Sequence, residues 1–373
     1  MIKMNTLQII RCLKKNMIKF NIPFKTKLKT FTKTDFIKKC ESFLEEKYNE
    51  KVLLTNSATS ALEMIANLAN INKEDEIITT SYTLSSTVLP FINKGAKIKF
   101  VDIDKETMCI DANLIEKAIT DKTKAVIVMY YAGIACDIEL IVKLCKKYNL
   151  KLIEAAAQAI FTKHNKKMLG TFGDYACISF QDAKTFTMGE GGALIIKNAD
   201  EFEYATILRE KGTNRYDLLN GKINKYFWVG NGSSYMPANI NAQYLYKQFL
   251  IKNKIIAKRT KMFYRYYKEL KDVVDVQKYI GSCNTFYIIT RSPQEREELI
   301  KYLKIHGIMS AIHFIPLHSS AGGKLFKTEF IGKDVYTTNY SERLLRLPLH
   351  NYLTFFEQYK IISTVKEFFR GKK

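Results

Sequence analysis

The 373-residue sequence has no apolar run long enough to cross a membrane. Its longest nearly unbroken apolar stretch, residues 125–136, is far shorter than the roughly 20 residues that a spanning helix needs. A signal peptide is not predicted either, because Gln8, Arg11 and Lys14 interrupt the apolar residues near the N-terminus and no small-residue cleavage site follows. We therefore expect a cytoplasmic protein, and the lack of a span predicts no membrane partner.

The sequence also lacks paired cysteines and is poor in glycine and proline. Seven cysteines form an odd, widely spread set without a C-x-x-C pair. This pattern argues against a disulfide framework or a zinc cluster, favours a reducing compartment and predicts no metal site. With only 17 Gly and 6 Pro, the connections between elements should be short or built from polar residues.

Acidic residues are outnumbered, since 59 Lys and Arg face 37 Asp and Glu and leave a net charge of +22. Such an excess attracts polyanions but does not specify a fold. It is most uneven in residues 1–34, which contain nine basic residues and no acidic one. Nucleic-acid binding through this arm is one hypothesis, but no recognised binding motif accompanies the charge. We do not predict a nucleic-acid partner.

Hydrophobic periodicity divides the rest of the chain. Over residues 52–198, short apolar runs alternate with segments whose apolar residues recur every three to four positions. This alternation predicts an α/β domain with a mostly parallel sheet. A long helical stretch over 239–270 leads to a smaller α/β region, with a strand at 309–315 and a helix at its end. We expect a basic extension over 1–20, a large domain over 21–250 and a small C-terminal domain over 251–373.

Three stretches of the large domain could carry chemistry. Residues 56–62 join a strand to a helix, where free N–H groups and the dipole bind phosphate, although such a stretch alone is an ordinary helix cap. Residues 154–158 end a buried strand and alone form a small-residue packing site. Residues 179–184 place Lys184 before the glycine-rich turn 189–192, although one lysine is usually a solvated surface residue. Loops at the carboxyl ends of parallel strands are where ligands bind.

Together these stretches resemble the DegT/DnrJ/EryC1/StrS family of sugar aminotransferases, which use pyridoxal 5'-phosphate (PLP). Within the family, the chain looks most like the dTDP-4-amino-4,6-dideoxygalactose transaminases. The similarity runs from about Ile22 to the C-terminus, and its most specific pieces are 95–102 (GAKIKFVD), 118–123 (AITDKT), 209–215 (REKGTNR), 232–235 (GSSY), 313–318 (HFIPLH) and 341–348 (SERLLRLP). The resemblance implies an α/β protein of PLP-dependent transferase fold type I, like aspartate aminotransferase, with a large mixed-sheet domain and a small C-terminal domain.

The resemblance also implies roles for individual residues. Lys184 would be the catalytic residue that forms a Schiff base with PLP, since a desolvated amine can have the lowered pKa that nucleophilic attack needs. The other cofactor-binding positions would be Ala58, Thr59 and Ser179 at the phosphate, Gln158 at the ring hydroxyl, Leu84 and Ala155 at the ring, and Ser234 from the second subunit of a homodimer. The substrate-binding positions would be Arg215, His313 and His318, with Arg215 on the diphosphate of a nucleotide sugar.

The chain departs from the family pattern where the chemistry occurs. At position 155, relatives carry an aspartate that keeps the pyridine nitrogen protonated, and this chain has Ala155. The neighbouring Glu154 should point away, because side chains alternate faces along a strand. Other family residues are also replaced. Leu84 stands where relatives have an aromatic ring, and Tyr130 and Gln181 stand where they have histidines. In the dimer-facing helix, Asn239 and Asn241 replace Asp and Gln.

Several functions are compatible with these residues. The first is an aminotransferase that moves an amino group, with glutamate as donor, onto a nucleotide-linked 4-keto-6-deoxy sugar for cell-surface polysaccharide. The second is a weak or inactive homologue that binds PLP or a nucleotide sugar, alone or as the partner of an active relative, and Ala155 and Leu84 favour it. A sugar dehydratase of the same fold is disfavoured, because those proteins resemble this family with histidine in place of Lys184.

Overall fold

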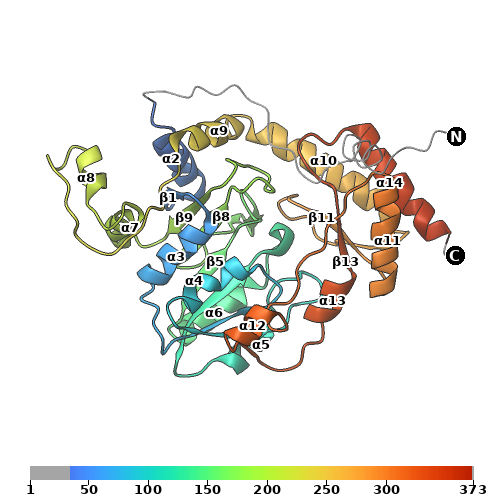
Figure 1. Cartoon of the computed structure of the whole chain (residues 1–373), viewed down its shortest axis with the longest axis horizontal. Helices are drawn as coiled ribbons and strands as arrows, with labels where there is room; N and C mark the ends of the chain where they lie inside the picture. Colours follow the sequence, from blue (N-terminus) through green and yellow to red (C-terminus); the bar gives the residue numbers. More distant parts are fainter. Residues whose placement is uncertain (1–33, 372–373) are drawn as a thin grey trace, which may run out of the picture.

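The computed structural model describes residues 34–371. The predicted basic extension over 1–20, and the start of the family-like segment at Ile22, lie outside the described residues. Figure 1 shows a large body built around one sheet, with α10, α11 and α14 gathered beside it. Within residues 34–371, no helix has the length and apolar character that crossing a bilayer demands.

The large sheet has eight strands in the order β1-β9-β8-β5-β4-β2-β3-β12. All neighbours pair in parallel except at β9, which is antiparallel to both β1 and β8. The strands are β1 (Lys51–Thr55), β2 (Glu76–Thr80), β3 (Lys97–Val101), β4 (Thr123–Met129), β5 (Lys151–Ala155), β8 (Tyr175–Ser179), β9 (Gly192–Ile196) and the short β12 (Glu329–Phe330). The predicted mostly parallel mixed sheet is therefore confirmed.

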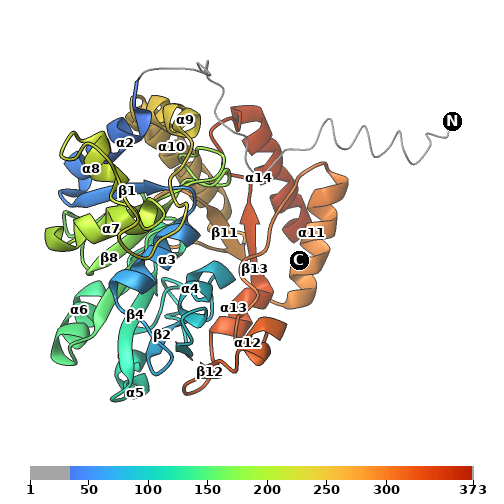
Figure 2. The same cartoon turned by 60° about the vertical axis from the view of Figure 1, so that its left-hand side comes forward.

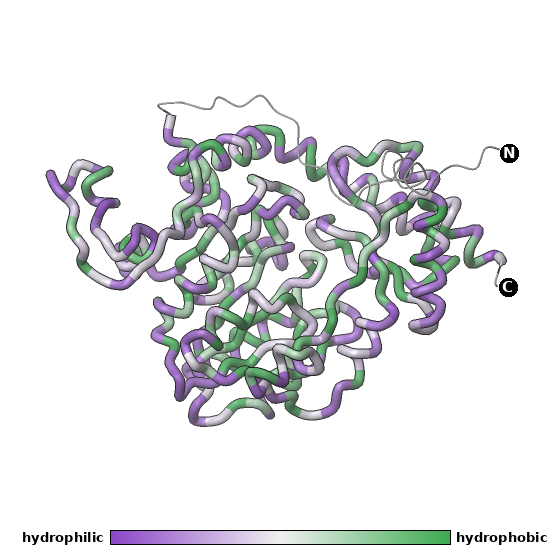
Figure 3. The backbone as a smooth tube through the Cα atoms, in the orientation of Figure 1, coloured by the Kyte–Doolittle hydropathy of each residue, from purple (hydrophilic) through white to green (hydrophobic). Residues whose placement is uncertain are grey.

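Helices cover both faces of this sheet. At the β1 edge, Leu53 packs into the core under α3 (Ala58–Leu68), whereas Val52 and Leu54 pack into a second core under α2 (Phe36–Tyr48) and α9 (Asn239–Phe249). This alternation follows from the period of two along a strand. In the middle of the sheet, α5 (Ala112–Ala118) packs on β3 and α6 (Ile138–Lys147) packs on β5. Figure 3 shows hydrophobic residues concentrated in the interior of the molecule.

The C-terminal part forms a separate layer with its own core. A three-stranded antiparallel sheet, β10 (Asp275–Val276), β11 (Phe286–Ile289) and β13 (Leu344–Leu347), packs with α10 (Lys252–Leu270), α11 (Pro293–Ile305) and α14 (Phe355–Arg370). The predicted helix over 239–270 is divided into α9 and α10. The prediction of a strand at 309–315 is wrong, because that segment makes only one bridge, from Ala311 to Arg346.

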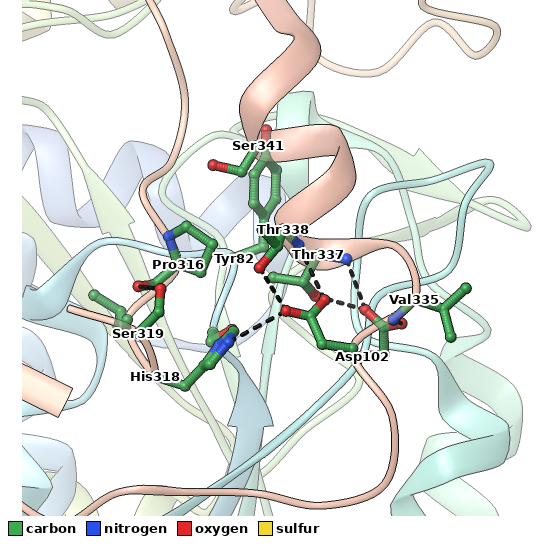
Figure 4. A network of polar contacts seen from close by, with 12 residues as sticks. Tyr82, Asp102, Pro316, His318, Ser319, Val335, Thr337, Thr338 and Ser341 are labelled. Atoms are coloured by element: carbon green, nitrogen blue, oxygen red, sulfur yellow. Dashed lines mark hydrogen bonds and ion pairs between the residues drawn. The ribbon is translucent and has the colours of Figure 1, made fainter. Parts of the chain in front are cut away.

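A buried carboxylate joins this layer to the large sheet. Asp102, directly after β3, accepts hydrogen bonds from the backbone N–H groups of Val335, Tyr336 and Thr337 at 2.8–2.9 Å and from Thr337 Oγ1 at 2.6 Å. These donors lie at the start of α13 (Thr337–Arg343), as Figure 4 shows. The contact positions α13 and, through it, β13, which carries the cavity residue Arg346.

An arm projects from the other side of the body. It begins after α7 (Phe202–Arg209), which packs on α3 and β1, and consists of α8 (Arg215–Leu219) and the loop up to residue 231. α8 and this loop extend away from the sheet in Figure 1 and face forward in Figure 2. The loop ends in Tyr226, Phe227, Trp228 and Val229, all of them exposed, and Trp228 keeps 83% of its surface accessible.

Candidate active site

A cavity of about 400 Å³ opens at the carboxyl ends of the parallel strands. Its floor contains Met129, Ala155 and Cys177, which end or lie near the ends of β4, β5 and β8. Met129 pairs with Ala155 and Ala155 pairs with Cys177, so the three residues form one row on one face of the sheet. The floor of the cavity therefore offers one thiol and no carboxylate.

One wall of the cavity is the N-terminus of α3. Ser57 caps this helix, since its Oγ accepts from Ser60 N at 3.0 Å, and Ala58 and Thr59 form the first turn. Gly192 allows β9 to pass directly beside this turn, because a Cβ atom there would lie 2.4 Å from Ala58 N. Ser179, the last residue of β8, pairs with Gly192 and lines the same cavity. First-turn N–H groups and hydroxyls suit a phosphate.

Lys184 lies in the loop after β8 and lines the cavity. Removal from water is the largest influence on its amine, and the positive charge of Arg346 acts in the same direction. Together they lower the pKa of Lys184 to about 8. A substantial fraction of the amine is therefore neutral and nucleophilic near physiological pH. The cavity thus combines a lysine with a phosphate-binding wall, which is the donor set that PLP requires.

The remaining predicted cofactor contacts in the large domain also line the cavity. Gln158 is buried, and its Oε1 accepts from Ala132 N at 2.9 Å, which leaves Nε2 as its donor for a ligand. Leu84 stands at the opening of the cavity with 56% of its surface exposed. An aliphatic side chain there can contact a ring but cannot stack on it as an aromatic would.

Glu154 points away from the cavity, as the alternation along β5 predicts. Its carboxylate accepts from Tyr130 Oη and from the backbone N–H groups of Gly170 and Gly173, each at 2.6 Å. Burial raises the pKa of Glu154, and these three donors oppose that effect. Glu154 therefore holds the segment after β7 (Lys167–Met168) against β5 and is not available to the cofactor ring.

Removing this carboxylate should destabilise the fold. Glu154→Ala leaves two buried N–H groups and one hydroxyl without an acceptor, and each such group costs about 1–3 kcal/mol. We expect a loss of about 3 kcal/mol or more in the free energy of unfolding, measured by urea denaturation. Tyr130→Phe, which removes one donor and leaves the carboxylate, should cost about 1 kcal/mol. Equal stability of Glu154→Ala and the wild type would contradict this account.

Arg346 is a cavity residue that the sequence analysis missed. It lies on β13, lines the cavity, donates from Nε to Thr285 Oγ1 at 2.7 Å and contacts the ring of His313. Burial and the charges of Arg346 and Lys184 lower the pKa of His313 to about 2, so this imidazole stays neutral. The matching segment 341–348 was recognised as family-like, but nothing in its spacing indicated which residue would enter the site.

The cavity is consequently electropositive. Among residues 34–371, the charged residues that line it are the largely enclosed Lys184 and Arg346 and one carboxylate, Glu190, whose side chain is exposed. His313 adds a neutral polar group, with its ring stacked on Phe314 at a centroid distance of 4.2 Å. This lining is suited to an anionic ligand or to one that carries several anionic groups.

Three other predicted site residues lie outside this cavity. His318 contacts Ser81 Oγ at 2.8 Å and Asp334 Oδ2 at 3.2 Å, as part of the junction in Figure 4. Arg215 begins α8 on the arm and pairs with Glu210 at 3.1 Å. Ser234 is exposed at the base of the arm, where its carbonyl accepts from Asn56 Nδ2 at 2.9 Å. Their roles in binding stay predictions.

The fold and the cavity together define a PLP-dependent enzyme of fold type I. Residues 25–366 match the DegT/DnrJ/EryC1/StrS aminotransferase family. An uncharacterized protein of Methanocaldococcus jannaschii is 33% identical over 333 residues, which cover 84% of each chain. GDP-perosamine synthase of Escherichia coli O157:H7 is 32% identical over 296 residues, or 77% of this chain and 79% of that one.

A solved structure agrees with these relatives. The putative sugar aminotransferase Spr1654 of Streptococcus pneumoniae, in its PLP form, superposes with a TM-score of 0.84 at 25% identity, covering 95% of this chain and 99% of that chain. The protein belongs to the DegT/DnrJ/EryC1/StrS aminotransferase family and is a PLP-dependent sugar aminotransferase. The family, the fold class and the cofactor are thus confirmed as predicted.

Proposed function

We propose that the protein transfers an amino group from glutamate to a nucleotide-linked 4-keto-6-deoxy sugar that is used for cell-surface polysaccharide. The observation that carries this proposal is the convergence of Lys184, Ser179, Thr59 and Gln158 on one electropositive cavity. A relative whose name states a nucleotide-sugar product, GDP-perosamine synthase, supports the substrate class. The resemblance to the dTDP-4-amino-4,6-dideoxygalactose transaminases makes a dTDP-linked sugar our specific candidate.

In this proposal each residue has a defined task. PLP, when bound, supplies an electron sink for moving a proton next to the reacting nitrogen. Lys184 would hold the cofactor and, when its amine is free again, would carry that proton as base and acid. A pKa of about 8 suits both tasks near neutral pH. The α3 N-terminus and Ser179 anchor the phosphate, and Gln158 Nε2 meets the ring hydroxyl.

A second candidate is favoured by the cavity floor. The row of Met129, Ala155 and Cys177 places no carboxylate beside the expected ring nitrogen. A ring that is not held protonated is a poorer electron sink, so turnover would be slow. The alternative function is therefore a weak or inactive homologue that binds PLP or a nucleotide sugar, alone or paired with an active relative.

An absorbance experiment separates these two candidates. Purified protein is mixed with PLP and its spectrum is recorded before and after addition of glutamate. A visible band of lysine-bound cofactor that converts to the pyridoxamine form supports the aminotransferase. A band that persists indefinitely with glutamate supports the homologue that binds PLP without turnover. No band at all contradicts PLP binding in either candidate and leaves only the homologue that binds a nucleotide sugar.

We propose further that Arg346 anchors a carboxylate of the amino donor. A charge-assisted hydrogen bond contributes about 1.5–3 kcal/mol, so Arg346→Met should weaken binding of the unreactive dicarboxylate glutarate by about ten- to a hundredfold in calorimetry. Arg343→Met is the matched control, because Arg343 ends α13 and bonds Asn339 outside the cavity lining. Equal glutarate affinity in the two variants would remove Arg346 from this role.

We propose a homodimer in which the arm of one subunit approaches the cavity of the other. The exposed Tyr226, Phe227 and Trp228 on the arm, and the exposed Leu84 at the cavity opening, are apolar surfaces that a partner would cover. Light scattering with PLP present should give twice the mass of the chain, and Trp228→Ser should shift it toward the monomer. Ile305→Ser, on α11, changes another exposed apolar residue, 73% accessible, and should leave the dimer intact. A wild type that is monomeric at micromolar concentration would contradict the proposal.

A further inference from the structure

One surface of the C-terminal layer combines exposed aromatic rings with basic side chains. It lies on α10 and the first turns of α14, which pack against each other in Figures 1 and 2. Phe356 keeps 81% of its surface exposed, Tyr359 63%, Phe355 55% and Tyr264 54%. We call this surface the aromatic–basic face. It lies apart from the cavity, since none of these residues lines it.

The hydrophobic core does not account for these rings. The inward sides of the same two helices, including Met262 and Tyr266 on α10 and Ile361 and Val365 on α14, already form the core of the C-terminal layer. The aromatic–basic face is therefore an additional apolar surface on the outside of completed helices. Large exposed rings gathered on one surface are typical of an interaction site.

The start of α14, which carries Phe355 and Phe356, is fixed by local contacts. Thr354 and Glu357 form a reciprocal capping box that fixes the first turn of α14. The guanidinium of Arg265 lies 4.3 Å from the centre of the Phe355 ring and donates to Gln358 Oε1 at 2.8 Å. The face is therefore presented by rigid elements, which lowers the entropy lost on binding.

The same two helices that carry these rings also expose basic side chains. The exposed side of α10 carries Lys254, Lys258, Lys261 and Lys268 in addition to Arg265, and α14 adds Lys360. Of the three carboxylates on these two helices, Glu357 is held in the capping box and Glu269 forms an ion pair with Lys366 at 2.5 Å, whereas Glu367 is exposed near the end of α14, away from its first turns. The aromatic–basic face is consequently complementary to an anionic surface.

We propose that the aromatic–basic face binds the surface of an anionic lipid bilayer. Phe and Tyr rings insert at headgroup depth, while Lys and Arg pair with lipid phosphates, so the protein lies on the membrane without spanning it. The sequence analysis predicts no membrane partner because the chain has no apolar run long enough to span a bilayer. Binding to the surface of a bilayer does not require such a run. The rings project from the outside of two adjacent helices, which suits a flat, deformable surface better than a partner with a preformed groove. This inference does not depend on the proposed reaction.

Vesicle flotation with the full-length protein tests the proposal. The probes are vesicles of phosphatidylcholine alone and of phosphatidylcholine mixed with phosphatidylglycerol. The wild type should float only with the anionic vesicles. Removing rings with Phe356→Ser and Tyr359→Ser, or reversing charge with Lys261→Glu and Lys360→Glu, should weaken binding by about tenfold or more. Leu325→Ser on α12 (Ala321–Leu325) alters an exposed residue, 73% accessible, away from the face and should bind as the wild type does.

Three results would overturn the proposal. One is no flotation of the wild type with anionic vesicles. Another is equal flotation of the wild type and both double variants, which would assign the binding to other basic segments such as residues 1–34. A third is binding of an RNA oligonucleotide, but not of vesicles, that the same variants abolish. Because every substituted side chain is exposed, the melting temperature of each variant should change little. Measuring it checks that each variant is folded.

Discussion

Lys184→Ala should eliminate the visible absorption band of the lysine-bound cofactor. Lys184 lines the cavity and is the nucleophile that we propose for bonding PLP, and alanine at this position cannot form that bond. Borohydride reduction of the wild type, followed by mass spectrometry, should place the cofactor on Lys184. Lys163→Ala, at an exposed lysine of β6 (Lys163–His164), is the control and should retain the band. Cofactor attached to a different lysine, or to none, would refute the assignment.

The rate of this attachment should depend on pH in a defined way. Only the neutral amine attacks, and the folded protein lowers the pKa of Lys184 to about 8. Below that pKa the neutral fraction falls tenfold for each pH unit, so the rate of PLP incorporation should rise with pH and level off above about 8. Arg346→Met removes one of the two causes of the lowered pKa, so its plateau should begin at higher pH.

Ala155→Asp should accelerate the half-reaction with glutamate by about ten- to a hundredfold. The estimate follows from a charge-assisted hydrogen bond of roughly 1.5–3 kcal/mol at the ring nitrogen and from tenfold in rate for each 1.4 kcal/mol. Loss of the protonated ring could make the deficit of the wild type larger. Adding Leu84→Phe should raise the rate further, since an aromatic ring can stack on the cofactor. Single-turnover absorbance on the wild type and on both variants measures these changes.

A matched control distinguishes this effect from a general effect of added charge. Ala157→Asp introduces the same carboxylate two residues away, in the same cavity lining, and should not accelerate the reaction. A fast wild type that Ala155→Asp fails to improve would mean that another group serves the ring nitrogen. The absence of a carboxylate in the row of Met129, Ala155 and Cys177 would then have no catalytic consequence.

Much of the fold follows from local sequence pattern. The period of two in β1 separates Leu53 from Val52 and Leu54 into different cores, as the alternation predicts. Periods near 3.6 in the sequence predict helices over 111–119, 138–148, 294–306 and 355–369, and these agree with α5, α6, α11 and α14 within one or two residues. The segment 309–315 was misread because its apolar residues resemble a strand, whereas only Ala311 finds a bridging partner on β13. Whether a short apolar run forms a strand depends on hydrogen-bonded pairing with a neighbouring strand, which its residue types alone do not determine.

The sequence alone determined the family, the cofactor, and the identity of the residue at position 155. These depend on residue types and their order along the chain, which need no coordinates. Local alternation also determined that Glu154 and Ala155 face opposite sides of β5.

Only the tertiary structure decided which distant residues share the cavity. The register of β4, β5 and β8 aligns Met129, Ala155 and Cys177, and the return of the chain through β13 brings Arg346 beside them. His318 belongs to a segment that matched the family as well as Arg346 did, yet it lies at the junction with Asp334. The physical reason is that strand register and domain packing are set by contacts between residues far apart in sequence, which no local pattern specifies.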